Sequence, residues 1–271
     1  MFFNFTRTAP ILFGAGAALQ TGQKLKELEV QKVLCVTDKG IVETGLITPI
    51  LDSVKEAGID VVLYDKVLAD PPDYVVEDCA ALAKEEQIEA IVGVGGGSSM
   101  DTAKAVNVLL GNTSPIVQYH DKSIPLKAGK PIVLLPTTSG TGSEVTGICV
   151  VTNTKEQKKG GIVGPPCHAT LAIVDPELAA GMPPKVTGAT GMDAFSHAAE
   201  AITSINTNPI SDTLAEKAIS LITNYLPRAV ENSSDMEART IMSLASVEAG
   251  IAFWDANPHL GHAISHVLKH I

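Results

Sequence analysis

The sequence lacks any apolar run long enough to cross a membrane, and its N-terminus lacks the charged segment and long apolar stretch of a signal peptide. Its four cysteines are scattered and form no CxxC pair, which favours reduced thiols in a soluble, cytoplasmic protein. Positive charge is in the minority, because 20 Lys and Arg stand against 30 Asp and Glu, for a formal net charge of −10. We therefore expect neither nucleic acid nor an acidic membrane surface as a partner.

The chain does have the length and apolar content needed for a full core. Its 271 residues, 45% of them hydrophobic, can form one large or two medium domains. Short β-rich runs alternate with segments of helical spacing in the first part of the chain. The runs lie at 32–37, 60–64, 90–94 and 131–135, and the helical segments at 47–57, 74–86 and 98–110. This alternation predicts a parallel sheet covered by helices on both faces.

The pattern changes in the second half of the chain. Two further strands are expected at 148–152 and 171–174, on either side of a polar turn at 153–159. From residue 183 onward only long helices are expected, at 191–204, 209–225 and 236–253, the second ending before Pro227. We therefore assign residues 1–180 to an α/β domain and residues 181–271 to an all-helical domain.

A glycine-rich turn follows the run at 90–94 and opens the next helix. It comprises Gly95, Gly96, Gly97 and Ser98. Glycines let backbone N–H groups approach a phosphate closely, and the helix N-terminus adds a favourable partial charge. The turn departs from the G-x-G-x-x-G pattern, because Ser98 stands where the third glycine should fall. We interpret it as a cradle for the pyrophosphate of a dinucleotide, with tight strand–helix packing as the alternative.

Two further segments follow strands of the predicted parallel sheet, at the edge where ligands of such sheets bind. Asp38 comes after the run at 32–37 and could accept a hydrogen bond from a ribose hydroxyl, although a simple turn residue is an equally good interpretation. The loop at 136–146 is dense in hydroxyls and glycine, and it includes Thr137, Thr138 and Thr141. We expect this loop to face a ligand, with a plain solvated loop as the alternative.

Two pairs of polar residues have the spacing of one helix face. Asp193 and His197 are four residues apart, and His262 and His266 repeat that spacing near the C-terminus. A carboxylate with imidazoles suits a divalent ion of the iron or zinc kind and leaves positions open for substrate or water. The alternative is that these are polar residues on ordinary helix surfaces, but two pairs in one chain favour the metal site.

Together, these motifs resemble the iron-containing (group III) alcohol dehydrogenase family. The resemblance rests on the glycine turn with Asp101 and Lys104, on the segment 136–144, and on Gly191-Met192-Asp193-Ala194 with His197. It spans residues 13–266, nearly the whole chain.

The resemblance implies a dehydroquinate-synthase-like fold, with a Rossmann-like dinucleotide-binding domain followed by a helical metal-binding domain. It implies reversible hydride transfer between NAD(P) and an alcohol or its aldehyde, with Fe²⁺ as the metal and Zn²⁺ as the alternative. We expect NAD as the cofactor, because the Asp38 carboxylate would repel a 2′-phosphate. We also expect a primary or small alcohol as the substrate, and a homo-oligomer. Asp193, His197 and His262 fall on the family's metal ligands, and His266 falls near the nicotinamide as a catalytic residue. The cofactor-contacting positions of the family correspond to Asp38, Gly95, Gly96, Gly97, Ser98, Thr137, Thr138, Thr141 and Lys159.

The chain also departs from the family pattern. The family's fourth metal ligand is a histidine in a Pro-His-Gly-like segment beyond His266, whereas this sequence ends at Ile271. We therefore expect a truncated helical domain with an incomplete metal set. A catalytically impaired, NAD-binding remnant of the same fold is the alternative function. Glycerol dehydrogenase and dehydroquinate synthase share the fold but are disfavoured, because the former tends to carry Lys in place of Ser98 and the latter's loop differs throughout.

Overall fold

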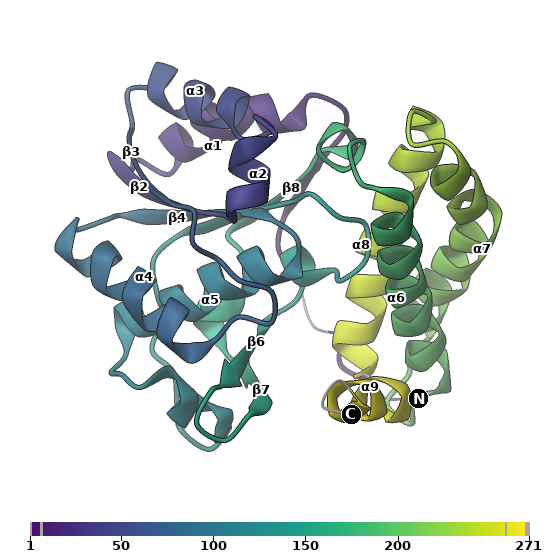
Figure 1. Ribbon diagram of the computed structural model, residues 1–271. Helices are drawn as coiled ribbons and strands as arrows, with labels where there is room; N and C mark the ends of the chain where they lie inside the picture. Colours follow the sequence, from purple (N-terminus) through teal and green to yellow (C-terminus); the bar gives the residue numbers. More distant parts are fainter. Residues whose placement is uncertain (1, 6–7, 258, 269–271) are drawn as a thin grey trace. The chain divides into compact units, whose positions relative to one another are not determined.

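The structure, a computed structural model of the chain, describes residues 2–5, 8–257 and 259–268, the last three by their backbone alone (Figure 1). The chain divides into two compact units. One, here the sheet unit, comprises Ala9–Thr137 and Gly147–Asp175, and the other, the helical unit, comprises Met1–Thr8, Thr138–Thr146 and Pro176–Ile271. The loop Thr138–Thr146 thus packs with the helices. The functional domains assigned to 1–180 and 181–271 stay a prediction.

The sheet unit is built on six parallel strands in the order β1-β8-β5-β4-β2-β3. They are β1 (Ile11–Phe13), β2 (Lys32–Val36), β3 (Asp60–Tyr64), β4 (Ala90–Gly95), β5 (Ile132–Pro136) and β8 (Leu171–Val174). The central strands β4 and β5 are buried at every position, which explains their continuous apolar sequence. The predicted parallel sheet is confirmed, and its carboxyl edge presents the segments that follow β2, β4 and β5.

Helices cover both faces of this sheet, as expected. Figure 1 shows α4 (Asp73–Glu85) and α5 (Gly97–Gly111) on one face, and α1 (Thr21–Glu27) and α3 (Thr48–Glu56) on the other. A short helix that the sequence did not suggest, α2 (Lys39–Glu43), begins directly after Asp38. Three 3₁₀ turns complete this part, η1 (Ala17–Gln20), η2 (Ile116–His120) and η4 (Pro165–Cys167).

A two-stranded hairpin lies beside α5 and was only half predicted. Strand β6 (Ile148–Asn153) pairs antiparallel with β7 (Lys158–Val163), so the polar turn after β6 leads into β7 and not directly to β8. The sequence Lys158-Lys159-Gly160-Gly161 has low β propensity and hid the second strand. The hairpin is attached to α5 through Asp101, whose carboxylate accepts a 2.9 Å hydrogen bond from the Val150 N–H.

In the helical unit, the described residues form four α-helices and two 3₁₀ turns. They are α6 (Pro184–Thr203), α7 (Pro209–Glu231), α8 (Met236–Ala256), α9 (Leu260–Leu268), η3 (Ser143–Val145) and η5 (Pro176–Ala179). The core between α6, α7 and α8 is dominated by buried alanines, whose small side chains let helices approach closely. No helix in the described part of the chain is both long and apolar enough to cross a bilayer.

Two helix boundaries differ from those expected. Helix α6 starts at Pro184 and not at Gly191, because Pro184 suits the first helical turn and the glycines within the helix concealed its early part. Helix α7 continues through Pro227 to Glu231 and does not end before the proline. Leu226 and Ala229 are buried on either side of it, so packing outweighs the cost of about 3 kcal/mol for a proline inside a helix.

Candidate metal centre and dinucleotide loops

Three of the predicted metal ligands come together in the helical unit. Asp193 and His197 lie one turn apart on α6, and His262 comes from α9. One ligating atom of each lies within 4.8 Å of those of the other two. The His262 Nε2 is 3.6 Å from an Asp193 carboxylate oxygen, and the rings of His197 and His262 stack with centroids 4.3 Å apart. The four-residue spacing on α6 and the position of α9 thus bring one carboxylate and two imidazoles together.

His197 has the properties of a neutral imidazole with an unused lone pair. It is 6% exposed and stacks on Phe253, with ring centroids 4.1 Å apart. Burial lowers the pKa of His197 to about 4, so the ring is neutral at physiological pH, the form in which histidine ligates a metal. Among the described residues, its buried Nδ1 has no hydrogen-bond partner. A buried, neutral imidazole with one nitrogen within 4.8 Å of a carboxylate oxygen is suited to hold a metal ion.

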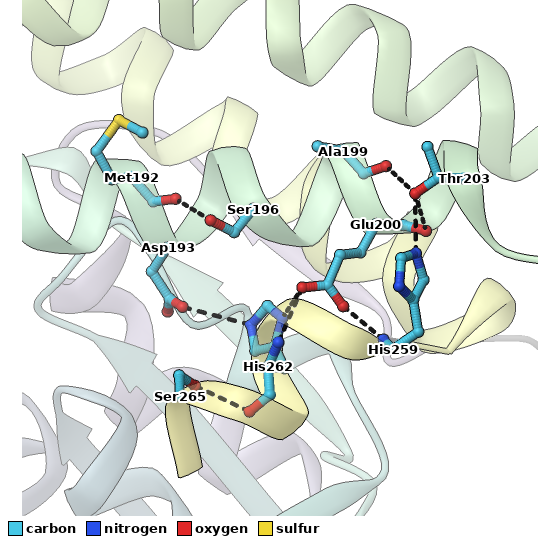
Figure 2. Close-up of polar contacts among 9 residues, drawn as sticks. All are labelled: Met192, Asp193, Ser196, Ala199, Glu200, Thr203, His259, His262 and Ser265. Atoms are coloured by element: carbon cyan, nitrogen blue, oxygen red, sulfur yellow. Dashed lines mark hydrogen bonds and ion pairs between the residues drawn. The ribbon is translucent and has the colours of Figure 1, made fainter. Parts of the chain in front are cut away.

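His262 lies between two carboxylates (Figure 2). Its Nε2 faces Asp193 and its Nδ1 is 2.8 Å from a Glu200 oxygen. Asp193 first, and then Glu200, raises the pKa of His262 against the opposing effect of burial. This environment favours positive charge at the ring, which a divalent cation would supply as well as a proton does. One carboxylate with two imidazoles is also a donor set that iron and zinc accept.

The predicted catalytic residue, His266, belongs to α9, where the structure describes its backbone but not its side chain. The structure therefore leaves its role as a prediction.

The glycine turn and Asp38 lie together in the sheet unit. Gly95 has a φ of +148°, and a Cβ built there would lie 2.5 Å from the Ser99 hydroxyl, so only glycine fits. Gly96 is the N-cap residue of α5, and the helix starts at Gly97. Ser99 Oγ is 3.3 Å from Asp38 Oδ2, which places the carboxylate beside the turn. Because β2 and β4 are parallel neighbours, both features lie at one edge of the sheet.

Lys159 reaches the same edge through a residue that the sequence did not single out. The N–H of Asp70 donates to Ser98 Oγ at 3.3 Å, and the Asp70 carboxylate is 2.5 Å from Lys159 Nζ. Burial lowers the pKa of Lys159. Asp70 has a φ of +52°, and the following Pro71-Pro72 was the signal of a fixed turn there.

The three predicted threonines divide between the two units. The Thr137 N–H donates to the Gly95 carbonyl at 2.9 Å, so this residue lies beside the glycine turn. Thr138 and Thr141 belong to the loop that packs with the helices, where the neighbouring Ser139 hydroxyl lies 3.0 Å from that of Ser243. The buried Thr138 Oγ1 has no hydrogen-bond partner within the part of the chain that the structure describes.

A parallel sheet with a glycine turn at its carboxyl edge, together with a helical unit that presents a carboxylate and two imidazoles, defines a nucleotide-dependent metalloenzyme. Comparison with known proteins identifies which kind. Residues 8–176 match the model of iron-containing alcohol dehydrogenase, and residues 187–270 match the C-terminal model of the Fe-containing alcohol dehydrogenase family. The chain therefore belongs to the iron-containing alcohol dehydrogenase family.

Individual relatives of the chain are also dehydrogenases. The chain is 40% identical over 263 residues to an NAD-dependent methanol dehydrogenase of Bacillus methanolicus, a match that covers 97% of this chain and 69% of the relative. It is 41% identical to a choline dehydrogenase of Bacillus subtilis, over 98% of this chain and 67% of the relative.

Solved structures resemble the whole chain. A crystal structure of 1,3-propanediol oxidoreductase superposes with a TM-score of 0.94 at 38% identity and covers 100% of this chain and 71% of its own. A sulfoacetaldehyde reductase from Bifidobacterium kashiwanohense in complex with NAD⁺ gives a TM-score of 0.95 at 36% identity, with 100% and 72% covered. The predicted family, fold class, enzyme class and cofactors are confirmed: this is an NAD-dependent alcohol dehydrogenase of the iron-containing type.

Proposed function

We propose that the chain transfers hydride reversibly between NAD and a small primary alcohol or its aldehyde, with a divalent metal held by Asp193, His197 and His262. The observation that carries this assignment is the convergence of the three ligating atoms within 4.8 Å in a chain of this family. The relatives that act on methanol, on 1,3-propanediol and on long-chain alcohols motivate the substrate class.

Each residue of the cluster has a separate task. His197 contributes a neutral imidazole, because burial keeps it unprotonated. His262 contributes its Nε2, and Asp193 contributes negative charge that favours a cation at this point. A divalent metal held by these three residues would act as a Lewis acid and lower the pKa of the substrate hydroxyl, so no side chain of the protein has to act as a nucleophile.

The sheet unit serves the cofactor. We assign the pyrophosphate to the N–H groups of Gly96, Gly97 and Ser98 at the start of α5, where the partial charge of the helix favours an anion. Asp38 is assigned to the adenosine ribose, because its carboxylate lies beside the same turn. Thr137, Thr138, Thr141 and Lys159 remain predicted cofactor contacts, and the homo-oligomer and the cytoplasmic location also remain predictions.

The test is a pair of variants that each remove one negative charge from the helical unit. Asp193→Asn removes the proposed ligand charge, whereas Glu216→Gln changes an exposed residue of α7 and serves as the matched control. Co²⁺ uptake followed by absorption spectroscopy, and NADH formation with short alcohols in added Fe²⁺ or Zn²⁺, should both be lost in Asp193→Asn alone. Equal Co²⁺ binding by the two variants would refute the metal assignment. NAD binding without any turnover of the parent chain would favour the alternative of a binding remnant.

A further inference from the structure

Glu200 is a buried carboxylate that neither the sequence motifs nor the proposed mechanism uses. It lies on α6, one turn after His197, and its side chain is 10% exposed. Its oxygens accept hydrogen bonds from three donors, all in the segment that carries α9 (Figure 2). The donors are the His259 N–H, the His262 N–H at 3.0 Å and the His262 Nδ1 at 2.8 Å. A single carboxylate thus holds both the backbone and the ring of a proposed ligand.

We propose that Glu200 is a positioning residue for the metal site: it fixes His262 as the tautomer that carries its proton on Nδ1 and leaves the Nε2 lone pair for the metal. This inference rests on the proposed function, since it takes His262 to be a ligand. An ionised carboxylate can only accept hydrogen bonds, so the Nδ1 that faces it must be the donor. The remaining nitrogen, Nε2, then faces Asp193 across 3.6 Å, a gap between two acceptors that a cation would bridge.

The geometry makes both oxygens of Glu200 hydrogen-bond acceptors. One oxygen accepts from the His259 N–H and the other from the His262 N–H, and a backbone N–H can only donate. Both backbone donors belong to the start of α9, where free N–H groups and the helix dipole favour a negative charge. The orientation of the ring and the position of the helix that bears it therefore depend on the same two oxygens.

Gly261 permits the close approach of α9 to the Glu200 carboxylate. A Cβ built at Gly261 would lie 2.4 Å from Glu200 Oε1, so a side chain at that position would displace the carboxylate. Glycine between the two anchored residues His259 and His262 keeps the contact possible. Glycine at this position thus matches the hydrogen-bond geometry and supports a dedicated carboxylate site.

A neighbouring contact supplies the control. The Thr203 hydroxyl is 2.8 Å from the His259 Nε2, so it anchors the same turn. Within α6 it contacts the backbone carbonyls of Ala199 and Glu200, but not the Glu200 carboxylate. Thr203→Val removes that anchor at nearly constant volume. A general loosening of the turn would affect both Thr203→Val and Glu200→Gln, whereas loss of ring orientation would affect Glu200→Gln alone.

The first measurement uses the metal-free full chain. Long-range ¹H–¹⁵N NMR at mildly alkaline pH distinguishes the two imidazole tautomers, and the His262 signals can be assigned by comparison with His262→Gln. We expect the Nδ1–H tautomer in the parent chain and in Thr203→Val, and a shift toward the Nε2–H tautomer in Glu200→Gln, whose amide can donate to Nδ1. An Nε2–H tautomer in the parent chain would overturn the proposal, and it decides the matter even if Glu200→Gln fails to fold.

The second measurement is Co²⁺ affinity by competition with a chelator. We expect about a 10- to 100-fold loss in Glu200→Gln, the usual effect of removing the hydrogen-bond partner of a metal-bound histidine, and no measurable loss in Thr203→Val. Equal losses in the two variants would mean that Glu200 only anchors the turn, which overturns the proposal. If Asp193→Asn binds Co²⁺ as well as the parent chain does, the metal assignment fails instead, and the tautomer of His262 still tests the role of Glu200.

Discussion

A glycine-to-alanine exchange in the middle of α8 tests how the threonine loop is seated on the helices. Gly250 faces Gly142, and a Cβ built on Gly250 would lie 2.9 Å from the Gly142 Cα and 2.8 Å from a Val145 methyl. The contact is equally close from the side of the loop, because a Cβ built on Gly142 would lie 2.6 Å from the Gly250 Cα. Gly142 also has a φ of +60°, so the loop crosses the helix in a conformation that itself favours glycine.

Two effects of Gly250→Ala oppose each other. Alanine improves helix propensity by about 1 kcal/mol relative to glycine. Inserting a methyl group into a closely packed contact costs about 1–3 kcal/mol, and the upper part of that range applies here because a backbone atom cannot rotate away. We therefore expect Gly250→Ala to lower the free energy of unfolding by about 1 kcal/mol or more, despite the gain in propensity.

The matched control is Gly188→Ala on α6, where the nearest atom to a built Cβ is a Val230 methyl at an ordinary 3.8 Å. Here propensity acts alone, and we expect the free energy of unfolding to rise by about 0.5–1 kcal/mol. Urea titrations of both variants, compared with the parent chain by their midpoints and slopes, measure the difference. If Gly250→Ala were stabilised as much as Gly188→Ala, the close contact between the loop and α8 would not exist.

Three further predictions concern cofactor choice, buried charge and thiol reactivity. Asp38→Asn keeps a side-chain oxygen for the Ile41 N–H but removes the negative charge. The preference for NAD over NADP should therefore fall by about tenfold or more, the effect of losing about 1.4 kcal/mol of repulsion. An unchanged ratio of the two dissociation constants would refute the assignment of Asp38. Arg239→Met should lower the free energy of unfolding by about 2 kcal/mol in urea titration, because Arg239 is 1% exposed and its guanidinium donates to Thr187, Met182 and Ser233; a stability equal to that of the parent chain would mean that these hydrogen bonds contribute nothing. All four cysteines are buried, and burial raises the pKa of Cys35 to about 12, so a thiol reagent at mildly alkaline pH should label none of them until the chain unfolds.

The sequence predicted those features that depend on local residue patterns. The strands of the sheet were recognisable because a strand buried on both faces must be apolar throughout, as β4 and β5 are. Asp193 and His197 were paired because helix geometry alone puts residues four apart on one face. Most of the fold and the pairing of Asp193 with His197 follow from such rules.

What escaped prediction depends on contacts between distant segments. Nothing near Glu200 indicates that it meets a segment 59 residues further along the chain, and nothing near Asp70 indicates its contact with Lys159. Helix α7 runs past Pro227 because buried neighbours compensate for the proline, and local propensity cannot register that gain. The glycines of α6 hid its first turns for the same reason.

The double engagement of Asp38 constrains how cofactor preference can change during evolution. One carboxylate oxygen caps α2 through the Ile41 N–H, while the carboxylate as a whole is the proposed determinant against a 2′-phosphate. Replacement by alanine would remove the repulsion but also the cap, at a cost of about 0.5–2 kcal/mol, whereas asparagine or serine keeps a capping oxygen and glycine costs only a few tenths. A change of preference toward NADP therefore has few tolerated first substitutions at this position, namely asparagine, serine or glycine. An apolar residue would be tolerated only after other substitutions had stabilised α2.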